Sequence, residues 1–150
     1  MDIKKAKEMA VELMEKYSLL EDGGWQFQFS QARRQYGLCM LGKRIIKLSA
    51  PLTKLNSEES VRDTILHEIA HALVGRGHGH DRTWQTKAIE IGCNGQAKYG
   101  EEVRTPAKKY VGECPKCHHE YYRDKQRRCS CGKCTRKFNP DYLLVWRLNK

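Results

Sequence analysis

The chain has 150 residues and a formal net charge of +10, with 39% hydrophobic and 31% charged residues. This length suits one ordinary domain, or a domain of about 100 residues with a small appendage, and it excludes a large multidomain enzyme. No stretch of 18 residues is free of charge, so neither a membrane span nor a signal peptide is expected.

The first predicted elements are a helix and three strands. Apolar residues at spacings of three and four predict an amphipathic helix from about Ile3 to Ser18. Aromatic residues then alternate with polar ones over residues 25–29, which is typical of a half-buried strand. Two further strands, Gln35–Met40 and Lys43–Ser49, flank a short connection suited to a hairpin, and we expect Pro51 to end the sheet.

Two more helices are predicted in the middle of the chain. Asn56 or Ser57 can cap the first, which should run to about Val74 because three glycines follow within residues 75–79. Asp81 can cap the second helix, which we expect to end before residue 92. Residues 93–109 then form an irregular connector.

The first of these helices carries the pattern His67-Glu68-Ile69-Ala70-His71. Residues four apart lie on one helix face, so the two imidazoles can point at one ion, while apolar residues form the opposite stripe. Zinc suits neutral imidazole ligands and keeps one coordination position for water at catalytic sites. A third ligand is then needed, and His78 and His80 are the candidates. Glu68 would accept a proton from the water that attacks a peptide carbonyl.

A second pattern consists of two C-x-x-C turns separated by 13 residues. Cys114, Cys117, Cys131 and Cys134 are predicted to hold one structural zinc ion in a ribbon, because a segment of about 40 residues cannot bury a sufficient core alone. Metal ligation in a reducing cytosol outranks disulfides here. Cys129 is a second-ranked replacement for Cys131. Cys39 and Cys93 are expected to be small buried hydrophobic residues.

The positive charge is concentrated around these cysteines. Residues 98–150 hold 14 Lys and Arg against 6 Asp and Glu, whereas residues 1–97 hold 14 against 12. Cations interleaved with aromatic rings favour sequence-independent contact with DNA, single-stranded DNA included. The candidate contact residues are Lys108, Lys109, Lys116, Arg123, Lys125, Arg127, Arg128, Lys133, Arg136 and Lys137.

The two patterns in this order resemble the SprT-like family. The resemblance rests on His67-Glu68-x-x-His71, on His80 followed four residues later by Trp84, and on the C-terminal ribbon. It selects His80 over His78 as third ligand. It implies a zincin-like α+β domain with a glutamate base, and proteolysis of DNA-bound or DNA-crosslinked proteins as part of crosslink repair, with the zinc module helping to sense DNA.

We therefore expect an α+β protein with a zincin-like metallopeptidase domain over residues 1–97, a basic zinc ribbon over 98–150, and one catalytic and one structural zinc ion. We expect it to be intracellular and associated with DNA: cytoplasmic, or nuclear if the source is eukaryotic. The strand Lys43–Ser49 is expected to offer its edge to an extended substrate. One alternative is a nucleic-acid-binding protein with a purely structural histidine site, and another is a metallopeptidase whose ribbon binds protein. His78 and several tyrosines stay open as oxyanion-stabilising groups.

Overall fold

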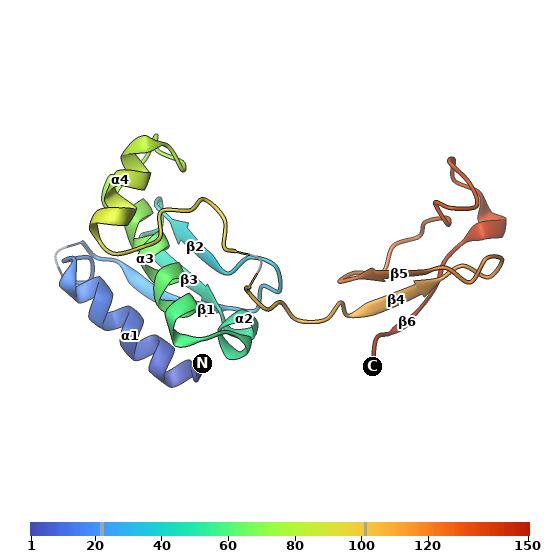
Figure 1. Ribbon diagram of the computed structural model, residues 1–150, viewed down its shortest axis with the longest axis horizontal. Coiled ribbons are helices and arrows are strands. Elements are labelled where there is room, and N and C mark those ends of the chain that lie inside the picture. Colours follow the sequence, from blue (N-terminus) through green and yellow to red (C-terminus); the bar gives the residue numbers. More distant parts are fainter. Residues whose placement is uncertain (22, 101) are drawn as a thin grey trace. The chain divides into compact units, whose positions relative to one another are not determined.

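The computed structural model describes residues 1–21, 23–100 and 102–150, and these form two compact units, Met1–Pro106 and Ala107–Lys150 (Figure 1). The expected α+β fold, with a small three-stranded sheet beside the helix that carries His67 and His71, is confirmed. Among the described residues, no helix is long and apolar enough to cross a membrane.

The boundary between the units lies later than the expected division between residues 97 and 98, because the chain after residue 97 is bound to the first unit. The Tyr99 hydroxyl donates a hydrogen bond of 2.9 Å to the backbone oxygen of Arg34. The Asn56 side chain exchanges two hydrogen bonds with the backbone of Arg104, of 2.7 and 2.8 Å. These hydrogen bonds give partners to the polar groups of Tyr99, Asn56 and Arg104, so this part of the chain is bound to the first unit and is not a loose connector.

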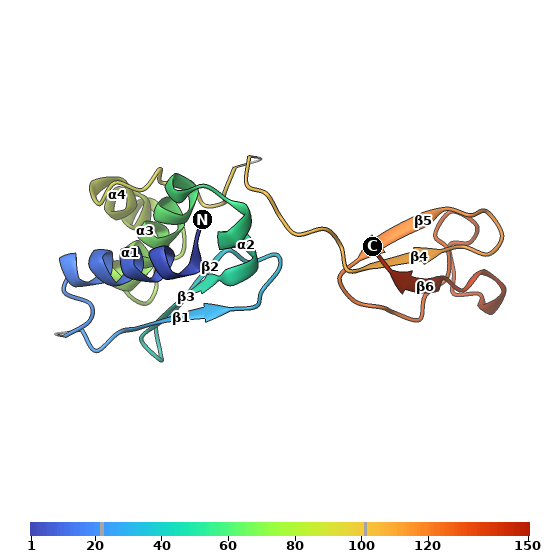
Figure 2. The same cartoon turned by 90° about the horizontal axis from the view of Figure 1, so that it is seen from below.

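The first unit begins with helix α1, Ile3–Lys16, as predicted. The Asp2 carboxylate caps it by accepting hydrogen bonds from the backbone nitrogens of Lys4 and Lys5. Its apolar stripe is buried at Ala6, Ala10, Leu13 and Met14. Helices α1 and α3 lie on the same side of the sheet (Figure 2).

The sheet contains β1 (Gln26–Ser30), β2 (Gly37–Met40) and β3 (Ile45–Ser49) in the order β1-β3-β2. β2 and β3 form the predicted antiparallel hairpin, and β1 pairs with β3 in parallel. The expectation that the strand Lys43–Ser49 offers a free edge is wrong, since β3 lies in the centre and both of its edges are paired. The edge strands are β1 and β2, and β2 is the one that packs extensively against α3.

A short helix, α2 (Ala50–Leu55), follows the sheet and was not predicted. The Ser49 hydroxyl caps it by accepting a hydrogen bond of 3.1 Å from the Leu52 nitrogen. Pro51 therefore begins a helix rather than only ending the sheet, as its fixed φ angle allows at a first helical turn. Asn56 ends α2, which leaves Ser57 as the cap of the next helix.

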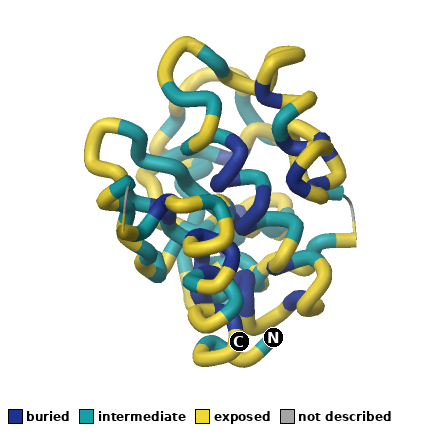
Figure 3. The backbone as a smooth tube through the Cα atoms, turned by 90° about the vertical axis from the view of Figure 1, so that its left-hand side faces the viewer, coloured by how far each residue is buried: buried dark blue, intermediate teal, exposed yellow. Residues whose placement is uncertain are grey.

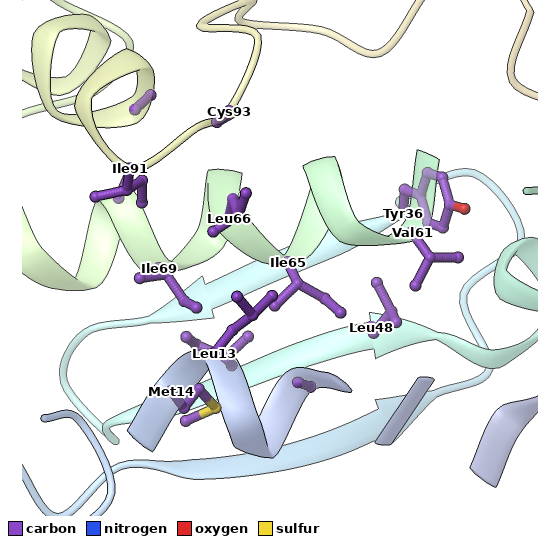
Figure 4. Packing of buried hydrophobic residues seen from close by; sticks show 14 of the residues in the cluster. Leu13, Met14, Tyr36, Leu48, Val61, Ile65, Leu66, Ile69, Ile91 and Cys93 are labelled. Carbon is purple, nitrogen blue, oxygen red and sulfur yellow. The ribbon is translucent and has the colours of Figure 1, made fainter. Parts of the chain in front are cut away.

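Helix α3, Glu58–Val74, runs through the middle of the unit. Figure 3 marks buried residues in dark blue, and those of α3 are Val61, Ile65, Leu66, Glu68, Ile69 and Ala70. Ile69 points toward Leu13 of α1, and Leu66 lies on the other side of α3, near Ile91 (Figure 4). A helix that is apolar on two sides is held firmly, because each side buries hydrophobic area against a different neighbour. This fixes the direction of the side chains on its remaining face.

Helix α4, Arg82–Glu90, packs on α3. Asp81 caps it as predicted, with its carboxylate accepting a hydrogen bond of 3.0 Å from the Trp84 nitrogen. The chain leaves the helix at Gly92, whose φ of 90° favours glycine. Cys93 is 5% exposed, so the prediction that it is a buried hydrophobic residue is confirmed.

The second unit contains a three-stranded antiparallel sheet in the order β5-β4-β6. Its strands are β4 (Tyr110–Glu113), β5 (Glu120–Arg123) and β6 (Val145–Leu148), with a short 3-10 helix, η1, at Pro140–Tyr142. Alternation of residues in the ribbon predicts short strands at 120–123, 127–129 and 142–148. The first is confirmed as β5, the third is shorter than predicted, the segment 127–129 forms no strand, and β4 has no such signal. Val111 is the one apolar side chain besides cysteine that is fully buried among the described residues of this unit.

Candidate metal centres

Three histidine side chains meet at one point of the first unit. His67 and His71 extend from α3, and His80 comes from the loop before α4. The Nε2 atom of His80 lies 2.9 Å from Nε2 of His67 and 3.1 Å from Nε2 of His71. Tetrahedral zinc with bonds of 2.0–2.1 Å separates its nitrogen ligands by about 3.3 Å. The donor set and its spacing therefore fit a zinc ion.

The chain reaches this arrangement through a tight reversal after α3. Gly75 and Gly77 have φ angles of 76° and 89°, which residues with a side chain rarely adopt. Nδ1 of His78 then lies 2.7 Å from Oδ2 of Asp81, the residue that caps α4. His78 thus fastens the loop that presents His80. Of the two candidates for third ligand, the structure brings His80 to the other histidines.

One aromatic ring packs against all three histidines. Trp84 is 1% exposed, and its ring centroid lies 4.6, 5.2 and 4.6 Å from those of His67, His71 and His80. The indole covers the imidazoles from below and keeps water away from that side. An aromatic residue four positions after His80 thus packs against all three imidazoles.

The protonation state of the histidines suits metal binding. Burial, and secondarily the neighbouring imidazoles, lower the pKa of His67 and of His71 to about 4. Both are therefore neutral at pH 7, the form that binds a metal. His67 also has a hydrogen bond to the backbone of Gln96. Such a bond at one ring nitrogen orients the other toward the ion.

Glu68 lies against strand β2. The residue is 7% exposed, and burial raises the pKa of its carboxyl to about 8, whereas a hydrogen bond from the Cys39 backbone lowers it. A carboxyl with a raised pKa in a cleft is suited to taking up and returning a proton near neutral pH. Glu68 and the three histidines line the same cleft.

This cleft has a volume of about 640 Å³. One wall is β2 with the residues before it, the floor is α3, and the other wall is the segment 94–99. The residue pattern does not indicate this second wall, because an irregular connector has no periodicity from which its path could be predicted. Cys39 lines the cleft and is half-buried, so the expectation of a buried core residue is corrected.

The candidate groups for oxyanion stabilisation differ in whether they line the cleft. Tyr36 and Tyr99 do so, whereas His78 is not among the described residues that line it. The two tyrosine rings meet edge to face with centroids 6.0 Å apart. The Tyr99 hydroxyl is already bonded to the Arg34 backbone. Together, the ring contact and this hydrogen bond hold the segment 94–99 against the residues just before β2.

Replacing His80 by Ala should remove one zinc ion per chain, because two imidazoles cannot complete a three-residue ligand set. His78→Ala should leave the zinc content unchanged and only loosen the loop before α4. Metal analysis of the two purified full-length variants measures the difference. Equal zinc contents in both variants would contradict the assignment of His80.

The four cysteines predicted for the ribbon converge in the second unit. Sγ of Cys114 lies 3.9 Å from Sγ of Cys134, and Sγ of Cys117 lies 3.6 Å from Sγ of Cys131. Tetrahedral zinc with Zn–S bonds of about 2.3 Å separates its sulfur ligands by about 3.8 Å. The cluster therefore fits zinc as well. Cys129, the alternative ligand, lies outside the group of four described sulfurs.

A tyrosine supports this cluster from the sheet. The Tyr121 hydroxyl lies 3.4 Å from Sγ of Cys131 and accepts a hydrogen bond of 3.3 Å from the Lys133 nitrogen. The hydrogen bond from Tyr121 lowers the pKa of the Cys131 thiol to about 6. A thiol that ionises below its usual range is a readier metal ligand.

The basic residues of the second unit are mostly exposed. Lys108 is half-buried and its Nζ pairs with Asp124 at 2.9 Å. The guanidinium of Arg128 lies over the Phe138 ring, 5.5 Å from its centroid, and Phe138 is 57% exposed. The structure places the other eight candidate residues at exposed positions: Lys109, Lys116, Arg123, Lys125, Arg127, Lys133, Arg136 and Lys137.

Comparisons with known proteins find one family and similar proteins for this chain. The model of the SprT-like family matches residues 6–111, which include the whole histidine centre. Protein SprT-like of Streptococcus gordonii is 26% identical over 131 residues, covering 79% of this chain and 87% of that protein. The zymogen of the metallopeptidase jannalysin of Methanocaldococcus jannaschii superposes with a TM-score of 0.48 and 13% identity, over 65% of this chain and 85% of that one.

Proposed function

The chain belongs to the SprT-like family, and on this premise we propose that it is a zinc-dependent metalloprotease. The observation that carries the proposal is the meeting of three imidazole nitrogens and a buried carboxylate in one cleft. His67, His71 and His80 would hold the zinc ion. When bound, zinc lowers the pKa of water to about 7, polarises a carbonyl and favours the ionised form of a nearby carboxyl.

Glu68 is the general base in this proposal. Its carboxylate accepts a proton from the water that attacks the peptide carbonyl and then donates it to the leaving amine, so that one group serves both halves of the reaction. The low polarity around a side chain that is 7% exposed strengthens its interaction with the attacking water. Neutral His67 and His71 do not compete for this proton.

We infer that β2 binds the substrate backbone. Among the described residues β2 pairs with β3 alone, and Gly37, Leu38 and Cys39 line the cleft. An extended peptide can add to such an edge through main-chain hydrogen bonds, which do not depend on its side chains. This mode of binding favours an unfolded or loosely folded protein segment as substrate.

The second unit is proposed to hold a structural zinc ion through Cys114, Cys117, Cys131 and Cys134, giving two zinc ions per chain. With so few buried apolar residues, this unit needs the metal for most of its stability. Residues 107–150 hold 12 Lys and Arg against 4 Asp and Glu. Four thiolates and one zinc ion together contribute −2, which leaves the unit strongly basic.

We further propose that this basic unit binds DNA and so directs proteolysis to DNA-bound or DNA-crosslinked proteins. Exposed lysines and arginines contact phosphates without reading sequence. Phe138, exposed and flanked by Arg128, offers a ring on which a base can stack. Stacking requires an unpaired base, so single-stranded DNA is the favoured form.

Replacing Phe138 by Ala should weaken the binding of single-stranded DNA about tenfold, in line with the loss of one stacked base. The matched control is Tyr122→Ala, which removes a 45% exposed ring whose hydroxyl donates a hydrogen bond to Glu120, whereas the Phe138 ring has a guanidinium over its face. Fluorescence anisotropy of a labelled oligonucleotide at several salt concentrations measures both variants. Equal losses of DNA affinity in the two variants would argue against stacking on Phe138. If the wild type does not bind DNA at all, the proposal is reduced to a protease without a DNA partner.

A further inference from the structure

Strand β2 presents a residue without a side chain to Glu68. A Cβ atom built at Gly37 would lie 2.4 Å from Oε1, 2.8 Å from Cγ and 2.9 Å from Cδ of Glu68. Non-bonded carbon and oxygen atoms do not approach this closely in folded proteins. The side chain of Glu68 therefore occupies the volume that any other residue at position 37 would need.

The requirement for glycine at this position is steric. The φ angle of Gly37 lies outside the left-handed region that disfavours other residues, so the backbone would accept alanine. Antiparallel pairing places Gly37 opposite Leu48, which is 1% exposed, and Cys39 opposite Ile46, also 1% exposed. β2 is thus anchored to the core and cannot move away from Glu68 at small cost.

Two residues of β2 act on the same carboxylate. Gly37 and Cys39 are two positions apart on β2, and both line the cleft together with Glu68. Gly37 provides the space for the side chain, and the Cys39 backbone provides a hydrogen bond to it. The carboxylate is thereby held at the strand edge where the cleft opens.

We propose that Gly37 is a positioning residue: by having no side chain, it lets the carboxylate of Glu68 lie against β2 at one fixed place in the cleft. The catalytic consequence rests on the proposed protease function. If β2 also binds the substrate backbone, one strand then sets the position of both the peptide bond and the general base. A side chain at residue 37 would push Glu68 into another rotamer without touching the histidines.

The test is a double-mutant cycle in the full-length protein with Gly37→Ala, Glu68→Ala and the two combined. Gly37→Ala alone should lower Tm by about 5 °C, the order of effect of overpacking a core. In the Glu68→Ala background the same change should shift Tm by less than about 1 °C or raise it, because the methyl group then has room. Gly42→Ala is the control, since its Cβ would meet only the end of the Arg76 side chain, at 3.3 Å.

The activity of Gly37→Ala provides the second measurement. The value of kcat should fall about 100-fold, with KM within about threefold of wild type and zinc content unchanged, because a displaced base slows chemistry without weakening binding. Additive Tm changes in the cycle, or wild-type kcat in Gly37→Ala, would overturn the proposal. If Gly37→Ala does not fold, folding of the double variant supports the steric contact, and its failure to fold refutes it.

The Tm cycle needs no substrate and separates the two proposals. A wild-type protein that cleaves nothing would refute the protease function, while the cycle would still decide whether Gly37 makes room for Glu68. Conversely, an active wild type with additive Tm changes would keep the protease and remove Gly37 from its mechanism.

Discussion

Replacing Glu68 by Gln should lower kcat/KM for peptide cleavage about 10³-fold while the protein keeps both zinc ions, since the loss of a general base costs 10²–10⁴-fold in rate. Glutamine has nearly the same shape but cannot accept the proton of the attacking water. The ligands His67, His71 and His80 are untouched by the change. Cleavage of a fluorogenic peptide, and of a basic protein bound to single-stranded DNA, measures the rate, and metal analysis measures the zinc content.

The matched control is Glu59→Gln, an equal change at an exposed residue in the first turn of the same helix. It should leave the rate unchanged within a factor of about two. If Glu68→Gln cleaves at the wild-type rate, Glu68 has no part in the mechanism. If neither the wild type nor the variants cleave while DNA is bound, the protein is instead a nucleic-acid-binding protein with a structural histidine site.

Replacing Cys131 by Ser should unfold the second unit and remove one zinc ion. Structural zinc contributes an apparent 10–16 kcal/mol in small zinc domains, which is more than the hydrophobic core of this unit can replace. Among the described residues, Val111 is the one fully buried apolar side chain there besides two of the cysteines. Amide resonances of residues 107–150 should collapse to unfolded positions, while those of the first unit persist, because the two units have separate cores.

Cys129→Ser is the control for this prediction. Cys129 is two residues away and lies outside the group of four sulfurs, so its replacement should leave the zinc content and the resonances of the second unit in place. DNA affinity should fall with Cys131→Ser and not with Cys129→Ser. Loss of zinc in Cys129→Ser but not in Cys131→Ser would reverse the ligand assignment.

Local patterns in the chain were enough to predict helices α1, α3 and α4, the histidine pair His67 and His71, and the four clustered cysteines. The i, i+4 spacing of His67 and His71 describes one helix face wherever that helix lies. The two C-x-x-C turns likewise contain their own geometry, and Asp81 caps α4 through atoms only three residues away. These features depend on contacts between near neighbours, which a pattern can express.

Features that depend on distant neighbours were mispredicted or missed. The strand Lys43–Ser49 was expected at an edge, but the parallel pairing of β1 with β3 encloses it, and no residue of β3 signals that β1 will add there. The path of residues 94–99 across the cleft was missed for the same reason. It is set by Tyr99 at the Arg34 backbone and by Gln96 at His67.

The residue pattern was thus sufficient to indicate the chemistry of the two centres, namely which side chains can bind zinc and which carboxyl can act as a base. The placement of these groups required the folded chain, since the burial of Glu68, its contact with Gly37 and the walls of the cleft arise from segments far apart in the chain. Ligand type is a property of single residues, whereas desolvation and steric complementarity exist only between packed elements.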